Sequence, residues 1–389
     1  MKTRIVLSII SLLAFTHIAI AQIKPDALVI SPFEKDFNLI FLPVTINDKE
    51  LHFIVDTGAG FSILDEFVAK ELNLEPNNVR IIERPGGEVR LGSIENISYA
   101  IGDYQSQMPI ATANLAEGGF NDYLGRSCAG ILGYDFISKY ALEIDYQNHL
   151  IGLYEPEEIN LKNGHQLTLE IKEGMPIIEG TINHKNLAAN GKWLIDTGSL
   201  MGLGVNQAFY EKYLDSKVNA KTSIAVGFGG STPGKMYKLD SFEFGEFNFR
   251  HVISGHAEDG INDELFDGVI GGELLSRFTL IFNYASKELY LIPNDKIWDP
   301  QRWDLSGTLL SSTDHGIEVL HVYENSPADQ VGIKVGDVIK RINQNNAKQL
   351  GLPNLWKIFH YHNLEQIHLE ILREDKIIEK NIVLNEYLN

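Results

Sequence analysis

Residues 51–59 read LHFIVDTGA and residues 192–199 read KWLIDTGS, so one acidic turn follows an apolar run twice in the same chain. The triplet Asp-Thr-Gly alone is a weak signal, because Asp and Gly are common in ordinary turns. Both copies here end segments rich in β-branched and aromatic residues, a pattern typical of buried strands. Burying the carboxylates of Asp56 and Asp196 at such positions is unfavourable unless hydrogen bonds or a function compensate. The two turns are therefore the first candidates for a functional site.

Two more matches at similar spacing indicate that the chain contains an internal repeat. Residues 101–104 read IGDY and match FGEF at 244–247, while residues 130–146 match 268–284 at an offset of 138 positions. Such ordered matches predict two homologous β-rich lobes, followed by an unrelated region. The expected bounds are residues 30–155 for the first lobe, 165–293 for the second, and 304–389 for a third domain.

Two carboxyl groups brought together by such a duplication would have a specific chemistry. Like charges a few ångströms apart cannot both ionise at low free-energy cost, so the pair retains one proton and titrates as a unit. The protonated member can act as an acid, and the ionised member as a base, toward a water molecule between them. If Asp56 and Asp196 meet, the sequence predicts a hydrolytic dyad.

The two lobes resemble the retropepsin and pepsin-like aspartic proteases. The resemblance covers about residues 30–293 and rests on both Asp-Thr-Gly segments and on the triplets ILG at 131–133 and VIG at 269–271. It implies a mainly β fold, in which a bilobal pair of acid-protease β-barrels places the active site between the lobes. It also implies roles for six residues: Asp56 and Asp196 as the catalytic pair, Thr57 and Thr197 as a brace between the lobes, and Gly58 and Gly198 as positions where backbone amides approach the carboxylates.

A Gly-rich segment follows each Asp-Thr-Gly turn, RPGGE at 84–88 and GFGGS at 227–231. The resemblance implies that these segments are flaps that close over an extended peptide substrate; ordinary Gly-rich hairpins are the alternative. The substrate-binding glycines would be Gly86, Gly87, Gly229 and Gly230. Two flaps on short lobes favour a covalently linked retropepsin pair over a standard pepsin. The active site would then form within one chain, and dimerisation would not be required.

The region after the second lobe carries a different signature. Residues 317–343 read IEVLHVYENSPADQVGIKVGDVIKRIN and resemble PDZ domains, notably those attached to bacterial exported proteases. The resemblance implies a C-terminal PDZ-like α+β domain over 304–389, with residues 352–362 as the groove helix. Ser306 and Gly307 would lie in the loop that holds the terminal carboxylate of a peptide ligand. The alternative is a PDZ unit that only packs against the lobes.

Composition excludes several other classes of function. The chain has 33 Lys and Arg against 52 Asp and Glu, a formal charge of −19 at pH 7, which excludes a general nucleic-acid binder and argues against association with anionic lipid. The single cysteine, Cys128, excludes an intrachain disulfide and a Cys-rich metal site. We expect its thiol to be a small buried side chain rather than a nucleophile.

The N-terminus predicts export. Lys2 and Arg4 precede an apolar run that ends in AIA at 19–21, which indicates a signal peptide over residues 1–21 and a mature chain that begins at Gln22. A membrane anchor is the alternative, but the run is short for a hydrocarbon core of about 30 Å. An exported chain without a cysteine pair favours a bacterial origin, with the product in the periplasm or outside the cell and no membrane insertion after cleavage.

Together these patterns predict an exported aspartic endopeptidase that acts on polypeptides and uses no metal or organic cofactor. Water activated by the Asp56 and Asp196 dyad would attack the peptide bond. The PDZ-like domain would bind a peptide or regulate the enzyme. The alternative from a different class is a non-catalytic peptide-binding scaffold, in which the lobes and the PDZ-like domain are retained but the two aspartates are mispaired.

Overall fold

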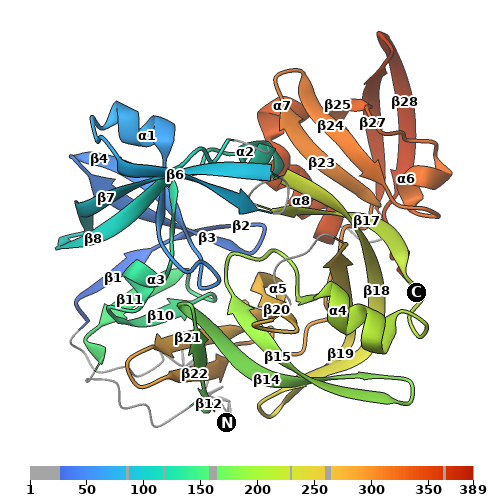
Figure 1. Ribbon diagram of the computed structural model, residues 1–389. Helices are drawn as coiled ribbons and strands as arrows, with labels where there is room; N and C mark the ends of the chain where they lie inside the picture. Colours follow the sequence, from blue (N-terminus) through green and yellow to red (C-terminus); the bar gives the residue numbers. More distant parts are fainter. Residues whose placement is uncertain are drawn as a thin grey trace, which may run out of the picture.

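The computed structural model describes residues 27–84, 87–116, 119–156, 164–227, 230–258, 264–361 and 365–388. These residues form four β-sheets with short helices at their edges (Figure 1). The predicted signal peptide at 1–21 lies outside the described residues. None of the described helices has the length and apolar character needed to cross a membrane.

The first lobe is one eight-stranded sheet. Its strand order is β2 (Glu34–Asp36), β3 (Leu39–Ile46), β4 (Lys49–Val55), β9 (Gly130–Leu132), β5 (Ile63–Asp65), β8 (Tyr104–Ala113), β7 (Gly87–Ile101) and β6 (Asn77–Arg84). Strand β3 also pairs with β7 at Thr45 and Ala100, which folds the sheet onto itself. Helices α1 (Glu66–Glu71), α2 (Phe120–Leu124) and α3 (Tyr134–Ile137) join its strands.

The second lobe repeats this order strand for strand. It runs β13 (Glu170–Lys172), β14 (Met175–His184), β15 (Leu187–Asp196), β20 (Gly268–Gly271), β16 (Leu203–Val205), β19 (Phe247–Ala257), β18 (Gly230–Phe244) and β17 (Lys221–Gly227). Strand β14 pairs with β18, as β3 pairs with β7 in the first lobe. Helices α4 (Gln207–Phe209) and α5 (Gly272–Leu275) and the π-helix η3 (Tyr210–Leu214) complete the lobe.

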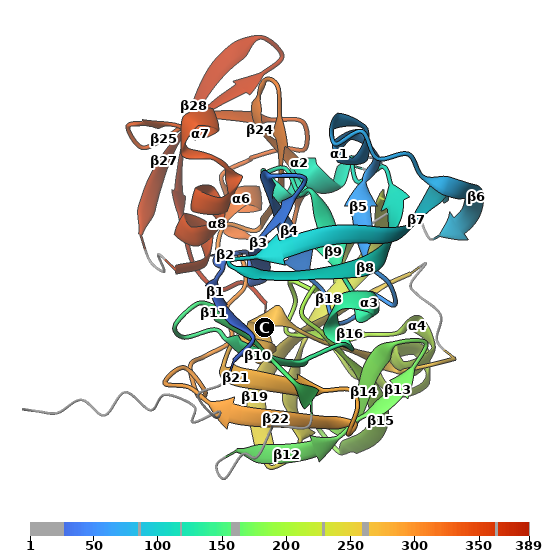
Figure 2. The ribbon, with the colours of Figure 1, turned by 90° about the vertical axis from the view of Figure 1, so that its left-hand side faces the viewer.

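A six-stranded sheet joins the lobes, and each lobe supplies half of it (Figure 2). The order is β1 (Val29–Pro32), β11 (Leu150–Tyr154), β10 (Ala141–Asp145), β21 (Phe278–Asn283), β22 (Glu288–Pro293) and β12 (His165–Thr168). At its centre Glu143 of β10 lies opposite Ile281 of β21. These two residues are also equivalent in the sequence repeat, so a pseudo-two-fold axis passes between them.

Local chemistry explains why the strands form where they do. Strand β3 buries nearly every side chain, because it lies in the middle of a folded sheet. The hairpin from β3 to β4 turns at Asn47 and Asp48, whose φ angles are 48° and 61°. Asn and Asp are the side chains that tolerate this left-handed region best, and two of them in succession favour a tight hairpin turn.

Residues 304–388, here called the C-terminal unit, form a separate sheet with its own core. Its order is β23 (Thr308–Thr313), β24 (Gly316–Val322), β25 (Val338–Ile342), β27 (Gln366–Arg373) and β28 (Lys376–Val383), with β26 (Asn345–Asn346) beside β25. Its helices are α6 (Pro327–Gln330), α7 (Ala347–Leu350) and α8 (Leu352–Tyr361). Helix α8 occupies the place predicted for the groove helix, and His362 lies outside the described residues. The unit lies beside α2 and the β17–β18 hairpin (Figure 1).

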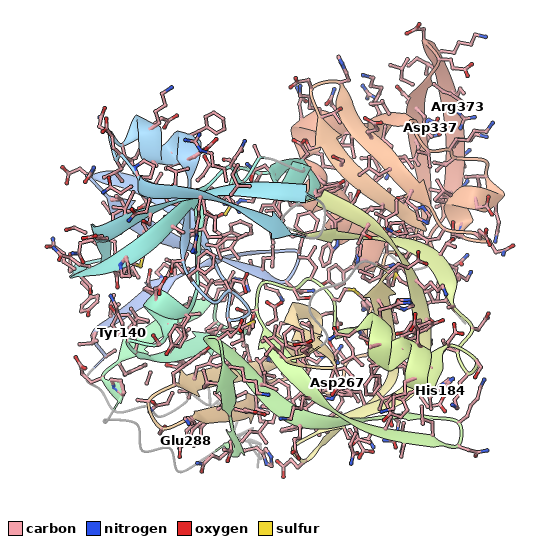
Figure 3. The ribbon with its side chains drawn as sticks, in the orientation of Figure 1. Tyr140, His184, Asp267, Glu288, Asp337 and Arg373 are labelled. Atoms are coloured by element: carbon pink, nitrogen blue, oxygen red, sulfur yellow. The ribbon has the colours of Figure 1, made fainter. Side chains whose placement is uncertain are left out.

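An ion pair with a buried carboxylate ties the C-terminal unit together. Asp337 is 1% exposed and accepts hydrogen bonds from Arg373 Nε at 2.6 Å and Nη2 at 2.7 Å (Figure 3). The backbone N–H of Lys334 donates to the same carboxylate at 2.8 Å. The loop before β25 is thereby fixed to the end of β27.

Arg373→Ala should locally destabilise the C-terminal unit, because it leaves the buried carboxylate of Asp337 without its cation. We expect a loss of about 3 kcal/mol, at the lower end of the range for breaking a buried pair. Hydrogen exchange of the β25 and β27 amides in the full chain measures it. Arg341→Ala is the matched control, since Arg341 pairs with Glu370 at the surface at 3.4 Å. Equal exchange in both variants would contradict the prediction.

Candidate active site

The two Asp-Thr-Gly turns begin at equivalent points of the two lobes. Asp56 follows β4, whose last residue Val55 lies opposite Leu132 of β9 in a parallel pair. Asp196 ends β15 and lies opposite Gly271 of β20 in the same arrangement. The triplets at 131–133 and 269–271 therefore lie directly beside the two turns. Strands that are buried on both sides hold each aspartate in place.

The carboxyl groups of Asp56 and Asp196 are in contact and share a hydrogen bond. Each one also accepts a bond at 2.8 Å from the glycine amide of its own turn, Gly58 to Asp56 and Gly198 to Asp196. A Cβ at Gly58 would lie 2.6 Å from Cγ of Asp196, and a Cβ at Gly198 would lie 2.4 Å from Cγ of Asp56. Glycine is required at both positions because the carboxyl group of the opposite lobe fills the space of a side chain.

Thr57 and Thr197 join the lobes beneath the carboxyl groups. The backbone N–H of each threonine donates to the hydroxyl oxygen of the other at 3.1 Å. The hydroxyl of Thr57 donates to the carbonyl of Ile195, and that of Thr197 to the carbonyl of Val55, both at 2.7 Å. The two threonines are 1% and 0% exposed. Four buried hydrogen bonds therefore set the distance between the turns.

Burial raises the pKa of both aspartates above the ordinary value for Asp. For Asp196 the nearby charge of Asp56 raises the pKa further, whereas for Asp56 hydrogen bonds from Asp196, Gly58 and Ala59 oppose the effect of burial. Since the two groups interact directly, their protons dissociate in steps that belong to the pair. The pair therefore keeps a proton at a pH where exposed aspartates are ionised.

The carboxyl groups line a cavity of about 1230 Å³, whose walls contain residues of both lobes. Its walls are largely apolar, with Ile131 and Leu194 among the contributors from the central strands. Leu200, next to the second turn, is 39% exposed and also lines the cavity. A space of this kind suits an extended chain with apolar side chains.

The two Gly-rich hairpins differ in their relation to this cavity. The β17–β18 hairpin lines it with residues 223–227 and 230–232, whereas the described residues of the β6–β7 hairpin contribute Leu91. Among the predicted flap glycines, Gly87 begins β7 and Gly230 begins β18 with a φ of 126°. Gly86 and Gly229 lie outside the described residues. The β6 strand carries two exposed apolar side chains, Val79 and Ile81.

The β17–β18 hairpin is held by the C-terminal unit. The hydroxyl of Tyr323 is hydrogen-bonded to Ser223 Oγ at 3.0 Å and donates to Met236 Sδ at 3.4 Å. Lys221 Nζ donates to the carbonyl of Glu324 at 2.9 Å. Sequence reasoning missed these contacts, because their partners lie about 90 to 100 positions apart and no local pattern links them.

The predicted ligand loop of the C-terminal unit already holds a carboxylate. Asp304 Oδ1 accepts bonds from Ser306 Oγ and the Gly307 amide at 2.6 Å each, and from the Thr308 amide at 3.1 Å. Burial raises the pKa of Asp304 to about 6, although these hydrogen bonds favour its ionised form. A role of Ser306 and Gly307 in binding a peptide terminus stays a prediction, and such a terminus would have to displace Asp304.

Three buried aromatic side chains, two near the aspartates and one on the cavity wall, were missed from the sequence. Tyr146 and Tyr284 are equivalent in the repeat, and within the described part of the chain their hydroxyls have no hydrogen-bond partner. Burial raises the pKa of both hydroxyls, and the nearby charges of Asp196 on Tyr146 and of Asp56 on Tyr284 raise it further. His256 lines the cavity, and its ring stacks on that of Tyr210 with 3.7 Å between the ring centroids. Burial lowers the pKa of His256 to about 4, so its ring is neutral at pH 7. The repeat was the signal that could have found the two tyrosines.

Cys128 lies outside this chemistry. Its side chain is buried, its thiol donates to the carbonyl of Gly130 at 2.9 Å, and burial raises its pKa to about 11. A thiol with such a pKa is a poor nucleophile. The interpretation of Cys128 as a small buried side chain is confirmed.

The first lobe matches a known family. The family model of gag-polyprotein putative aspartyl proteases matches residues 42–139, from within β3 to just beyond α3. The matched segment contains Asp56, Thr57 and Gly58 and the triplet at 131–133. A comparison with curated proteins found no match. The family match supports a retropepsin-like aspartic protease, which is a class of hydrolase.

Thr57→Val should weaken the junction between the lobes. The substitution removes a hydroxyl and leaves the carbonyl of Ile195 and the amide of Thr197 buried without their partners, at a cost of about 1–3 kcal/mol for each group. Thr57→Ser keeps the hydroxyl and is the control. Chemical unfolding of the full chain measures both. A serine variant as unstable as the valine variant would show that the methyl group, rather than the hydroxyl, matters.

Asp196→Asn should stabilise the protein increasingly as the pH rises. The folded wild type binds the dyad proton more tightly than the unfolded chain does. At low pH this proton therefore contributes to the free energy of unfolding. This contribution is lost as the pH rises from the ordinary pKa of Asp through the raised pKa that the dyad has in the folded protein. The variant lacks this loss, and its unfolding temperature relative to wild type should increase as the pH rises above the ordinary Asp pKa of about 4. A difference that does not change with pH would contradict the raised pKa.

Proposed function

We propose that this chain is an exported aspartic endopeptidase whose Asp56 and Asp196 activate one water molecule for attack on a peptide bond. One observation carries the proposal: two carboxyl groups from equivalent turns are in contact on the wall of a large cavity. Direct contact is what general acid–base hydrolysis by a shared dyad requires. It argues against the scaffold alternative, which needs a mispaired pair.

The geometry supports a mechanism in two proton transfers. An extended peptide lies in the cavity with its scissile carbonyl above the dyad. The ionised carboxylate takes a proton from water while the protonated carboxyl donates its hydrogen bond to the carbonyl oxygen, so that a tetrahedral intermediate forms. A carboxyl group then gives its proton to the leaving nitrogen, the C–N bond breaks, and the dyad returns to its singly protonated state.

The surrounding residues have supporting roles in this proposal. Thr57 and Thr197 hold the two turns at a constant distance, and the amides of Gly58 and Gly198 orient the carboxylates. The two Gly-rich hairpins serve as flaps that exclude water and bind the peptide backbone. The PDZ-like C-terminal unit holds one of them through Tyr323.

Export remains part of the proposal and rests on the N-terminal sequence. The basic residues and apolar run of residues 1–21 support secretion into the periplasm or beyond, and cleavage would leave a protein without membrane insertion. Because both aspartates belong to one chain, the site forms without dimerisation.

Asp56→Asn and Asp196→Asn should each reduce the cleavage of an unfolded protein substrate by at least about a thousandfold, since each removes one half of the acid–base pair. Glu179→Gln, at an exposed carboxylate on β14, is the control and should cleave at the wild-type rate. Product formation is followed over a range of pH, with and without an inhibitor that mimics the tetrahedral intermediate. If either Asn variant retains wild-type turnover, the shared dyad is wrong.

A further inference from the structure

The two lobes present different walls to the cavity beside the dyad. In each lobe a row of paired residues runs across the sheet, starting two positions before the aspartate, and its members share one face of the sheet. In lobe one the row is Ile54 of β4, Ile131 of β9, Ile63 of β5 and Ala111 of β8. In lobe two it is Leu194 of β15, Val269 of β20, Gly204 of β16 and Gly255 of β19. Lobe two therefore has two glycines where lobe one has isoleucine and alanine.

The missing side chains leave the wall of lobe two more open. Ile63 and Ile131 are 6% and 5% exposed, so the wall of lobe one is closed at this point. Their counterparts Gly204 and Val269 are both half-buried, and both line the cavity. Among the described residues, the atom nearest to a Cβ built at Gly204 is Cβ of Val269, at 3.7 Å, an ordinary van der Waals contact. The space that a side chain at Gly204 would occupy is thus part of the cavity.

Adaptable side chains surround this opening. Met175, Met201 and Met236 line the cavity from lobe two, and they are three of the five methionines in the chain. Met201 lies over Gly255, since its Cε would be 3.0 Å from a Cβ built there. Methionine is unbranched and adjusts its shape to a neighbouring group, whereas isoleucine is stiff because it branches at Cβ. The wall of lobe two can therefore yield to a large apolar side chain, and the isoleucine wall of lobe one cannot.

We propose that Gly204 determines substrate specificity, because the pocket beside it binds a large apolar side chain such as Phe or Trp. Ile63 fills the corresponding place in lobe one, which accepts only a smaller side chain. The pseudo-two-fold axis relates the two lobes, so their walls lie on opposite sides of the scissile bond. The substrate class is an extended peptide with a bulky apolar residue on one side of that bond and a smaller apolar residue on the other. This inference rests on the proposed peptidase function and adds its substrate class.

The test uses peptides with one scissile bond, in which the two residues on each side of the bond are varied one at a time among Ala, Leu, Phe and Trp. Wild type should prefer Phe or Trp at one position, and Ala or Leu at the matching position across the bond. Gly204→Ile fills the pocket, so the ratio of kcat/KM for the bulky peptide to that for its Ala version should fall at least about tenfold. Gly204→Ala, whose methyl group fits beside Val269, should lower the same ratio to a smaller extent.

The outcomes separate this inference from the peptidase proposal. Ala188→Ile is the matched control and should keep the wild-type ratio, because Ala188 is exposed on β15 and is not among the described residues that line the cavity. If wild type has the same size preference on both sides of the bond, or if both Gly204 variants keep the wild-type ratio, the pocket is wrong while the peptidase stands. If Gly204→Ile cleaves no peptide, the ratio for Gly204→Ala decides between these results. If wild type cleaves no peptide and no unfolded protein, the peptidase proposal fails and this inference fails with it.

Discussion

The reciprocal hydrogen bonds of Thr57 and Thr197 are the constraint on which the rest of the site depends. Two carboxyl groups repel each other whenever both ionise, so a fold must hold them together against that repulsion. Here each threonine bonds the backbone of the opposite lobe, and the bonds are buried where water does not compete. The six-stranded sheet relates the two lobes by a pseudo-two-fold axis. The threonine hydrogen bonds hold the two turns together at this axis, so that the side chains of the two aspartates are in contact.

The symmetry ends at the edge of the cavity. One hairpin is attached to the C-terminal unit through Tyr323, and the same unit meets the first lobe through Trp356 and Phe37. The two lobes of this duplicated protein thus differ in their contacts with the C-terminal unit, whereas the two Asp-Thr-Gly turns at the centre remain equivalent. The C-terminal unit contacts both lobes and contributes to the cavity wall, so its position bears on access to the aspartates.

Sequence patterns predicted the features that depend on near neighbours in the chain. The segment at 352–362 predicted a helix, and the structure has one at Leu352–Tyr361. Ser326 and Pro327 start α6 by ordinary helix capping. The repeat placed the two aspartates at matching points because the same strand and turn chemistry recurs. By contrast, nothing near Asp304 indicated that its side chain would fill the loop that follows it, since the outcome depends on how that loop folds around a carboxylate.

By itself the sequence determined that two apolar strands end in Asp-Thr-Gly, that the chain is duplicated, and that a different unit follows. These properties follow from residue order, periodicity and turn chemistry. Only the tertiary structure decided that the two carboxyl groups touch, that one hairpin is tied to Tyr323, and that the cavity continues onto α8. The physical reason is that each of these contacts joins residues roughly 100 to 300 positions apart, whose distance is set by the packing of whole sheets rather than by local preference.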